Sequence, residues 1–333
     1  MNKVSALLGS LIIFEMLAVA GPLGAQQWPE REISLVTSIP AFLPWETPNP
    51  QLAMVQAISA DLERKLKTQV IIDLKPGGGG TMAGNRLSEA KKDGYVLGLL
   101  EADPAISRVI QGYTPYGWDE MDPVALAWRE IKALVVPADK SWESLTNRPQ
   151  IDGNPRLATL GTTPVSGGTA MAMEAALRSG FRWNLTVVEK LDPAILLQGK
   201  AEAMVVPLGG LNTHPQADDF KIILVFTENT DLPCAWGHPT LADLGLKVTA
   251  DPPAAFYLPS KVNVSARRIF HGALKEIKAA EAGMLESACL EKLDQTFDDL
   301  PGFMDEQYHL QAEMLKKLGL APDISGLENN DGR

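Results

Sequence analysis

Short apolar runs alternate with amphipathic stretches along most of this chain. Three runs rich in aliphatic and β-branched residues, Ile33 to Thr37, Val70 to Leu74 and Val96 to Leu100, predict buried strands. Between the first two, apolar residues recur at helical spacing from Leu52 to Leu66. A second helix, expected to begin near Thr81, separates the second strand from the third. This β-α-β alternation predicts an α/β fold with a largely parallel sheet covered by helices.

A second unit with the same alternation follows the first. A strand from Leu157 to Leu160, a loop with the sequence GTTPVSGGT and a helix from Ala170 to Arg178 open this unit. Two such units, joined by more than one chain crossing, form a cleft, and ligands of α/β sheets bind at the carboxyl ends of strands. The remaining predicted strands are 124–128, 131–136, 186–188, 203–206, 222–224 and 254–258.

The pattern also predicts the domain organisation. Lys3 precedes an apolar run from Ala6 to Ala20, which is followed by small residues and is too short for a membrane span. We interpret residues 1–25 as a secretory signal peptide and expect a periplasmic protein; an uncleaved anchor or a disordered tail is the alternative. The predicted division is lobe one from 26–129 and 248–325, lobe two from 130–247, and a polar tail from 326–333.

Composition narrows the class of partner. Hydrophobic residues make up 45% of the chain and charged residues 21%, as in ordinary folded domains. The formal net charge of −11 disfavours nucleic acid and anionic lipid as partners. Local dipoles, not overall charge, would therefore have to hold an anionic ligand.

The sequence contains no recognisable cofactor or catalytic motif. The four histidines are scattered and show no metal-ligand spacing. No Gly-Lys-Ser/Thr follows the glycine run, and Gly-x-Ser-x-Gly is absent. We therefore expect neither an enzyme nor a cofactor or a metal. Cys234 and Cys289 could pair in an oxidising compartment. We expect two buried thiols instead, because the cysteines fall in different predicted lobes, where a bridge would restrict hinge motion.

Several short motifs occur in a characteristic order. Trp28-Pro29-Glu30 precedes the first strand, PGGGG precedes DGY, and YGWDEMDPV runs from Tyr116 to Val124. QGKAEAM begins at Gln198 and HPTLADLG at His238. In this order and spacing, residues 28 to 320 resemble a substrate-binding protein of the tripartite tricarboxylate transporter system, also called the Bug family.

The resemblance implies a type II-like, two-lobed periplasmic binding protein that closes on a small organic acid. Family members take di- and tricarboxylic or aromatic acids, hold them largely through backbone N–H groups, and deliver them to membrane permease subunits. We expect the same partners here, with a monomeric receptor. A signalling or partner-binding receptor with an altered or lost ligand site is the alternative, because the first loop, SIPAFLPWETPNPQL, departs from the family pattern. It is longer, lacks glycine, and has Leu52 near the expected aspartate.

Two glycine-bearing strand-to-helix junctions supply most of the candidate ligand contacts. Glycines free the backbone, and the start of a helix directs N–H groups and a positive dipole end toward an anion. Hydroxyl groups in the second junction add donors that need no arginine. Ordinary tight-turn and N-cap chemistry is the alternative explanation. The candidates are Gly78, Gly79 and Thr81 in the first junction, and Thr162, Thr163, Ser166, Gly167, Gly168 and Thr169 in the second.

The loop from Ser38 to Pro50 supplies the remaining candidates. Ser38, Phe42 and Trp45 are interpreted as a ligand clamp with an aromatic wall. The alternative is that the rings pack into lobe one or cap the cleft. Burying the Glu46 carboxylate beside a carboxylate ligand would cost free energy, because two negative groups would repel each other away from water. We therefore expect Glu46 to be solvated, unless the ligand carries a positive group such as an amine.

Overall fold

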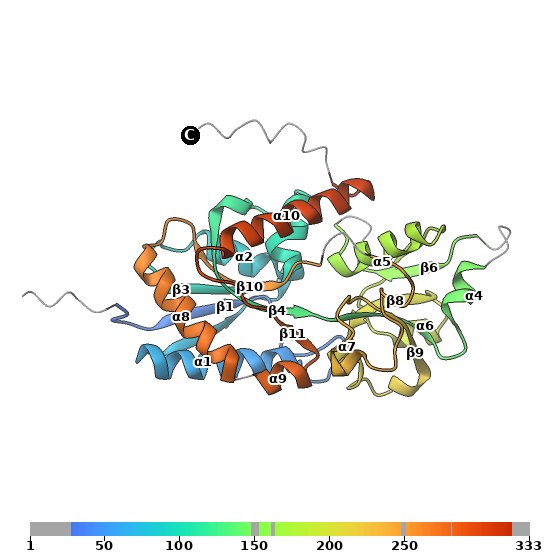
Figure 1. Cartoon of the computed structure of the whole chain (residues 1–333), viewed down its shortest axis with the longest axis horizontal. Coiled ribbons are helices and arrows are strands. Elements are labelled where there is room, and N and C mark those ends of the chain that lie inside the picture. Colours follow the sequence, from blue (N-terminus) through green and yellow to red (C-terminus); the bar gives the residue numbers. More distant parts are fainter. Residues whose placement is uncertain (1–27, 148–152, 161–163, 248–250, 281, 322–333) are drawn as a thin grey trace, which may run out of the picture.

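Two α/β units lie side by side, each built on one sheet (Figure 1). The computed structural model describes residues 28–147, 153–160, 164–247, 251–280 and 282–321. The predicted signal peptide and polar tail lie outside these residues. Within them, no helix combines the length and the apolar character that a bilayer crossing requires.

The first sheet takes strands from both ends of the chain. Its order is β11-β4-β10-β3-β1-β2. One group of helices, α1, α8 and α9, lies on one face, and α2 and α10 lie on the other (Figure 1). The strands are β1 (Ile33–Thr37), β2 (Val70–Leu74), β3 (Val96–Leu100), β4 (Met121–Glu130), β10 (Ala254–Pro259) and β11 (Leu290–Lys292), and the helices α1 (Pro50–Leu66), α2 (Thr81–Ser88), α8 (Val264–Ala280), α9 (Ala282–Ser287) and α10 (Leu300–Lys317).

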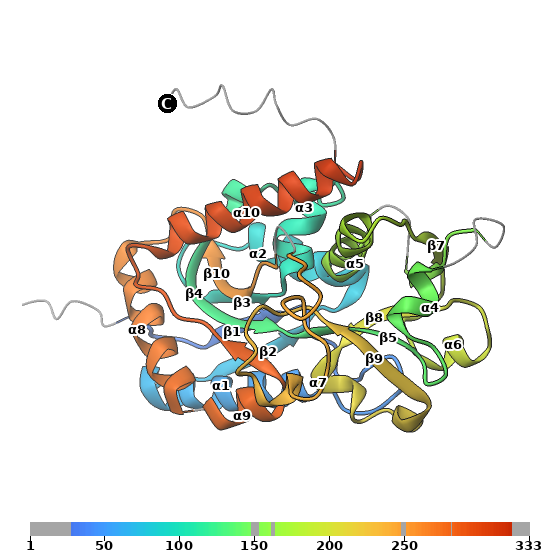
Figure 2. The same ribbon diagram turned by 45° about the vertical axis from the view of Figure 1, so that its right-hand side comes forward.

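The second sheet has the order β7-β6-β8-β5-β9. Helix α5 lies over one face, and α6 and α7 lie on the opposite side (Figure 1). The turned view brings α5 and α3 close to each other below α10 (Figure 2). The elements are β5 (Lys132–Pro137), β6 (Arg156–Thr159), β7 (Asn184–Val187), β8 (Ala203–Pro207), β9 (Phe220–Val225), α3 (Arg108–Ile110), α4 (Trp142–Thr146), α5 (Gly167–Arg178), α6 (Ala194–Leu197) and α7 (Leu208–Leu211).

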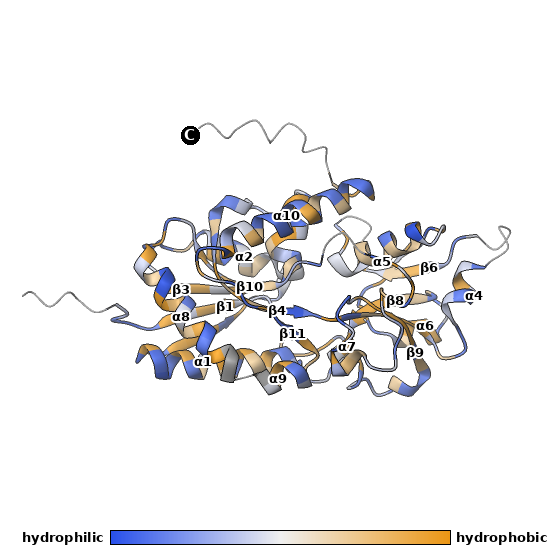
Figure 3. Ribbon diagram, viewed as in Figure 1, coloured by the Kyte–Doolittle hydropathy of each residue, from blue (hydrophilic) through white to orange (hydrophobic). Residues whose placement is uncertain are grey.

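Local sequence explains where the elements begin and end. Asn49 caps α1 by accepting a hydrogen bond from the Gln51 amide, and Pro50 occupies the first turn, where no N–H is needed. Lys67 ends this helix in the left-handed conformation. The strands carry the apolar residues and helix surfaces carry the polar ones (Figure 3), which is the pattern of sheets covered on both faces.

Both sheets are mixed. β1 pairs in parallel with β2 and β3, and β6 pairs in parallel with β7 and β8, as the alternation predicts. The antiparallel share is larger than β-α-β alternation alone suggests. It arises because β4, β5 and β10 enter the sheets as chain crossings between the units, without a helical crossover.

The prediction of two free thiols is wrong. Cys234 and Cys289 form a disulfide with a Cα–Cα distance of 5.7 Å. Cys234 follows β9 of the second sheet, whereas Cys289 precedes β11 of the first. Leu290, the next residue, pairs with Glu130 at the end of β4, where the chain crosses between the units. The bridge therefore lies close to the crossing and joins segments beside different sheets.

The predicted lobe boundaries at 129/130 and 247/248 stay a prediction. Residues from both sheets share one apolar cluster, which includes Val36 and Tyr257 of the first sheet and Leu134 and Leu157 of the second. The units are therefore packed against each other as well as covalently joined.

Candidate functional site

A cavity of about 300 Å³ lies between the two units. Its walls come from the loops at the ends of β1, β2 and β3 in the first unit, and from the loop before α5 in the second. The segment between β9 and β10 contributes Asp251, and α10 contributes Gln311. This is the position that strand-to-helix loops of α/β sheets commonly use for ligands.

Four of the predicted ligand contacts line this cavity. They are Ser38 and Gly79 from the first unit and Ser166 and Gly167 from the second. Ser38 donates through its Oγ to Glu101 Oε2 at 3.3 Å. Thr162 and Thr163 lie outside the described residues. Phe42, Trp45, Gly78, Thr81, Gly168 and Thr169 are absent from the described lining of the cavity.

The glycine turn before α2 uses its amides internally. Gly80 N–H donates to Pro76 O at 3.2 Å, and Thr81 N–H donates to Gly77 O. The Gly80 and Thr81 amides are thus used within the turn, and ligand contacts by Gly78 and Gly79 stay a prediction. The backbone needs glycine for another reason: Gly78 and Gly79 have φ of 65° and 64°, and a Cβ on Gly79 would meet the Arg108 guanidinium at 2.3 Å. Thr81 Oγ1 closes the turn on Gly78 O.

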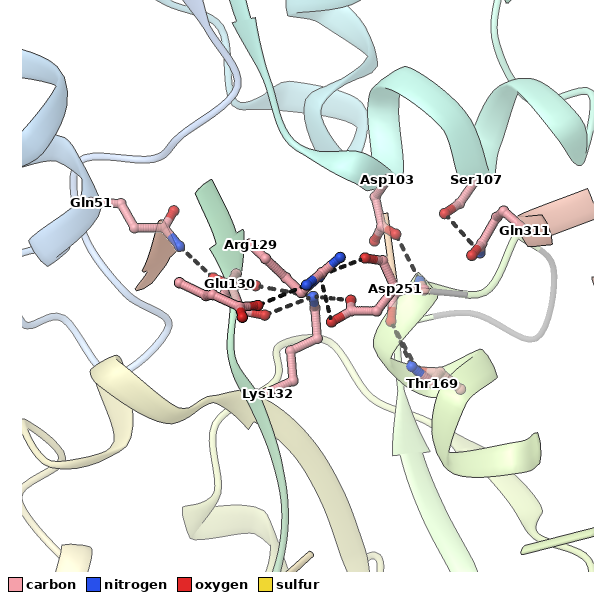
Figure 4. A network of polar contacts seen from close by, with 12 residues as sticks. Gln51, Asp103, Ser107, Arg129, Glu130, Lys132, Thr169, Asp251 and Gln311 are labelled. Atoms are coloured by element: carbon pink, nitrogen blue, oxygen red, sulfur yellow. Dashed lines mark hydrogen bonds and ion pairs between the residues drawn. The ribbon is translucent and has the colours of Figure 1, made fainter. Parts of the chain in front are cut away.

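The start of α5 is occupied by a carboxylate of the chain itself. Ser166 is the N-cap and accepts from Thr169 N–H at 3.1 Å. Gly167 N–H donates to Asp103 Oδ1 of the first unit at 2.7 Å (Figure 4). Gly168 faces inward instead, because a Cβ there would meet Val205 and Lys132. The helix start thus binds an anionic group, as its dipole favours, and that group bridges the two units.

The loop from Ser38 to Pro50 does not form an aromatic wall of the cavity. Phe42 is 61% exposed, whereas Trp45 is buried against His214 of the second unit, with ring centroids 5.3 Å apart. Trp45 Nε1 donates to Thr213 Oγ1 at 3.3 Å. Glu46 is exposed at the tip of the loop, as expected. The loop therefore reaches across to the second unit outside the cavity.

Four charged residues, Arg129, Glu130, Lys132 and Asp251, form a network where the chain crosses between the units (Figure 4). Lys132 Nζ lies 3.5 Å from Asp251 and 3.8 Å from Glu130. Arg129 lies 3.6 Å from Asp251. Burial alone would lower the pKa of Lys132, but the charges of Asp251 and Glu130 outweigh it and raise the pKa. Burial raises the pKa of Glu130 and of Asp251.

Glu101 and Asp103 add two further carboxyl groups to the cavity wall. Burial first, and then the charges of Glu130 and Asp103, raise the pKa of Glu101 from 4.5 to about 8. Lys132 and the Ser38 hydroxyl act in the opposite direction with smaller effect. The raised pKa favours the protonated form of Glu101 near neutral pH.

Comparison with known proteins assigns the family. The model of the tripartite tricarboxylate transporter family receptor, TctC, matches residues 54–320, which is most of the chain. The chain belongs to this family. The protein BugT of Bordetella pertussis is 22% identical to this receptor over 333 residues, covering 96% of this chain and 98% of BugT.

Solved structures share the fold of this TctC-family receptor. The Rpa4515 protein of R. palustris, solved with adipate, has a TM-score of 0.71 and 18% identity, covering 89% of this chain and all of that one. MatC of Rhodopseudomonas palustris, solved with bound malate, has a TM-score of 0.66 and 16% identity, covering 86% of this chain and all of that one. The two-lobed α/β architecture of the periplasmic binding proteins is therefore established for this receptor.

The receptor's described residues contain no group of side chains arranged to hold a metal ion. The charged residues of the cavity are the part that sequence reasoning missed. Glu130, Lys132 and Asp251 belong to no motif, and Asp251 is far from the other two in the chain. The sequence did offer one indication of carboxyl groups in the cavity. Glu101 and Asp103 directly follow a predicted strand, and ligand sites of α/β sheets lie where strand ends meet.

Proposed function

We propose that this TctC-family receptor captures a small carboxylate-bearing solute in the cavity between its lobes and delivers it to membrane permease subunits. The observation that carries the proposal is the cavity itself, which takes Ser38 and Gly79 from one unit and Ser166 and Gly167 from the other. A ligand held by both sides would favour the closed arrangement of the lobes.

The state of the α5 start supports the choice of ligand chemistry. Asp103 Oδ1 accepts from Gly167 N–H across the cavity at 2.7 Å. A ligand carboxylate that replaced Asp103 would suit the same helix start, because the helix dipole and the Gly167 N–H favour an anion. The adipate and malate of the two related structures are carboxylates.

The disulfide supports a location outside the cytoplasm. Structural disulfides persist in oxidising compartments such as the bacterial periplasm. We therefore propose a periplasmic receptor, in agreement with the signal peptide predicted for residues 1–25. Delivery to a permease and a monomeric state complete the proposal.

Thermal-shift screening followed by isothermal titration calorimetry tests the binding function. The panel contains aliphatic di- and tricarboxylates, aromatic acids and amino acids. We expect at least one member to raise the melting temperature and to bind with a one-to-one stoichiometry. A flat response across the whole panel would contradict the proposed function.

Substitution of Gly167 tests the position of the site. A Cβ on Gly167 would lie 3.1 Å from Asp103 Oδ1 and 3.4 Å from Ser107 Oγ, so a larger side chain would hold the lobes apart. Gly167→Val should weaken binding of the ligand found in the screen by about tenfold or more, which is the scale of a lost 1.4 kcal/mol. Gly272→Val in α8 is the control, because nothing lies within 4 Å of its Cβ position. Equal affinities for the two variants would place the ligand elsewhere.

A further inference from the structure

One of the two cations in the cavity wall has no partner of opposite charge. The described lining contains two basic side chains, Arg108 and Lys132. Lys132 lies within ion-pair distance of Asp251 and Glu130, and its charge also acts on the other two carboxyl groups of the lining. Arg108 makes no ion pair and no side-chain hydrogen bond with any described residue. An unpaired guanidinium at the wall of a cavity suits an anionic ligand.

Neutral groups lie next to the Arg108 side chain. Burial raises the pKa of the Tyr116 phenol more than the Arg108 charge lowers it, and the Tyr116 hydroxyl donates to Pro104 O at 2.8 Å. The Nε atom of Arg108 is buried without a hydrogen-bond partner among the described residues. The terminal nitrogens are therefore the part of the guanidinium that a ligand in the cavity can reach.

The glycine turn before α2 provides the space for this guanidinium. A Cβ on Gly79 would lie 2.3 Å from a terminal nitrogen of Arg108 and 2.5 Å from its central carbon. Gly79 also has φ of 64°, which glycine adopts without strain. The absence of a side chain at position 79 thus lets Arg108 lie against the backbone of the turn. The turn would then serve an anion through Arg108.

We propose that Arg108, lying on the glycine turn at Gly79, binds a carboxylate of the ligand and gives the cavity its preference for anions. This inference rests on the proposed receptor function and identifies a side chain that determines its specificity. A guanidinium presents paired N–H donors that match a carboxylate, and it stays charged at all relevant pH values. A side-chain contact of this kind differs from the largely backbone binding that the family resemblance implies.

Calorimetry with Arg108 variants tests the contact. The probes are malate, adipate, citrate and benzoate, together with the tightest acid from the screen. Arg108→Gln should weaken the acids that bind by about tenfold to a hundredfold, which is the scale of a lost hydrogen-bonded charge pair. Arg108→Lys should recover only part of this loss, because an ammonium group keeps the charge but lacks the planar pair of donors.

The melting temperature of the unliganded protein separates binding from folding. The Arg108 guanidinium makes no hydrogen bond or ion pair with a described residue, so Arg108→Gln should leave this temperature nearly unchanged. A clear drop in the melting temperature together with unchanged affinity would assign Arg108 a structural role and overturn the inference.

Gly79→Ala tests the position of the guanidinium without changing its charge. The added Cβ should displace the flexible end of Arg108 and weaken binding about as much as Arg108→Gln does. The double variant Gly79→Ala/Arg108→Gln should bind no more weakly than Arg108→Gln alone, because both changes remove the same contact. Gly199→Ala is the control for a side chain at positive φ. Gly199 has φ of 69°, nothing lies within 4 Å of its Cβ position, and its variant should keep the wild-type affinity.

The outcomes separate this inference from the receptor function. If the acids that bind have equal affinity for the wild type and for Arg108→Gln, the inference is overturned and the receptor function stands. Additive losses from Gly79→Ala and Arg108→Gln would overturn the part of the inference that concerns the glycine turn. If no probe and no other acid of the screen binds the wild-type protein, the receptor function itself is contradicted and this inference falls with it.

Discussion

Single residues in the cavity combine two kinds of chemistry. Gly167 and Ser166 form the helix start that the sequence suggested, with backbone donors facing the other unit. Asp103 of the first unit accepts the Gly167 amide at that helix start, and burial raises the pKa of the neighbouring Glu101. The ligand must therefore be accommodated by a site that already contains its own carboxyl groups.

Glu101 should make the stability of the receptor dependent on pH. Its pKa is about 8 in the folded protein, compared with the ordinary value of 4.5 expected in the unfolded chain. Between pH 4.5 and 8 the folded state therefore binds more protons than the unfolded state. The associated stability is fully present below about pH 4.5 and is lost as pH rises to about 8. Glu101→Gln should reduce this loss by on the order of 4–5 kcal/mol, measured by urea unfolding across that range.

The comparison with Glu89→Gln makes this test specific. The exposed Glu89 side chain should leave the pH profile of the free energy of unfolding unchanged, because its removal alters no buried charge. Parallel profiles for wild type and Glu101→Gln would show that Glu101 is ionised throughout the range, in conflict with its burial beside Glu130 and Asp103.

Among single residues, the sequence predicted the glycines that line the cavity better than it predicted the charged side chains there. Gly79 and Gly167 stand beside predicted strand ends, so their place in the cavity followed from the fold class. Lys132 and Asp251 meet only because β5 and the segment before β10 are adjacent after folding. No periodicity or motif in one sequence encodes such a tertiary pair.

Whole elements were predicted well where the apolar runs were short and clearly bounded. β1, β2 and β3 begin and end at the predicted residues, because polar or turn-forming residues flank each run. β11 was not predicted, since its three residues, Leu-Glu-Lys, carry no strand pattern. Pairing with β4 beside the disulfide creates this strand, which is a tertiary effect.

The loop from Ser38 to Pro50 should act as a contact between the lobes. Trp45 packs on His214 and donates to Thr213, and Lys190 Nζ donates to Pro44 O at 3.2 Å. Trp45→Ala should lower the free energy of unfolding by about 3 kcal/mol, as expected for loss of a buried tryptophan. It should also weaken ligand binding, because the closed arrangement loses a contact outside the cavity.

Phe42 in the same loop provides the matched control. Its ring is mostly exposed, so Phe42→Ala should change stability by no more than about 0.5 kcal/mol and leave ligand affinity intact. Chemical denaturation and calorimetry of both variants make the comparison. Loss of affinity in Phe42→Ala alone would restore the original interpretation of an aromatic clamp.

The disulfide connects segments beside two different sheets and should be present in the native protein. A thiol reagent should detect no free thiol in the native protein. After reduction it should detect two, from Cys234 and Cys289. The double variant Cys234→Ser/Cys289→Ser should lose about 2–4 kcal/mol of stability, chiefly through a less restricted unfolded chain. Ligand affinity should change little, because neither cysteine lines the cavity. Two reactive thiols in the native protein would contradict the bridge.

The whole molecule has its two lobes in contact around the cavity. Gln111 exchanges two hydrogen bonds of 3.0 Å with the Val165 backbone of the other unit. Asp103 reaches Gly167, and Lys317 at the end of α10 reaches Glu174 in α5 at 3.3 Å. Such contacts hold the two units together around the cavity, and a ligand that contacts both units would favour this arrangement.

The two-lobed plan was accessible from sequence because it depends on the order of elements. The interlobe contacts were not accessible, since each joins residues more than fifty positions apart through side chains that have ordinary local alternatives. Ser166, for example, is a normal N-cap in sequence and lines the cavity only in the folded protein.

A crystal structure with the tightest ligand from the screen tests the central claim most directly. The account predicts one ligand molecule in the cavity, with polar contacts to the Ser38 and Gly79 side and to the Ser166 and Gly167 side at once. A ligand bound to the outer surface, or to one lobe with no contact to the other, would contradict it.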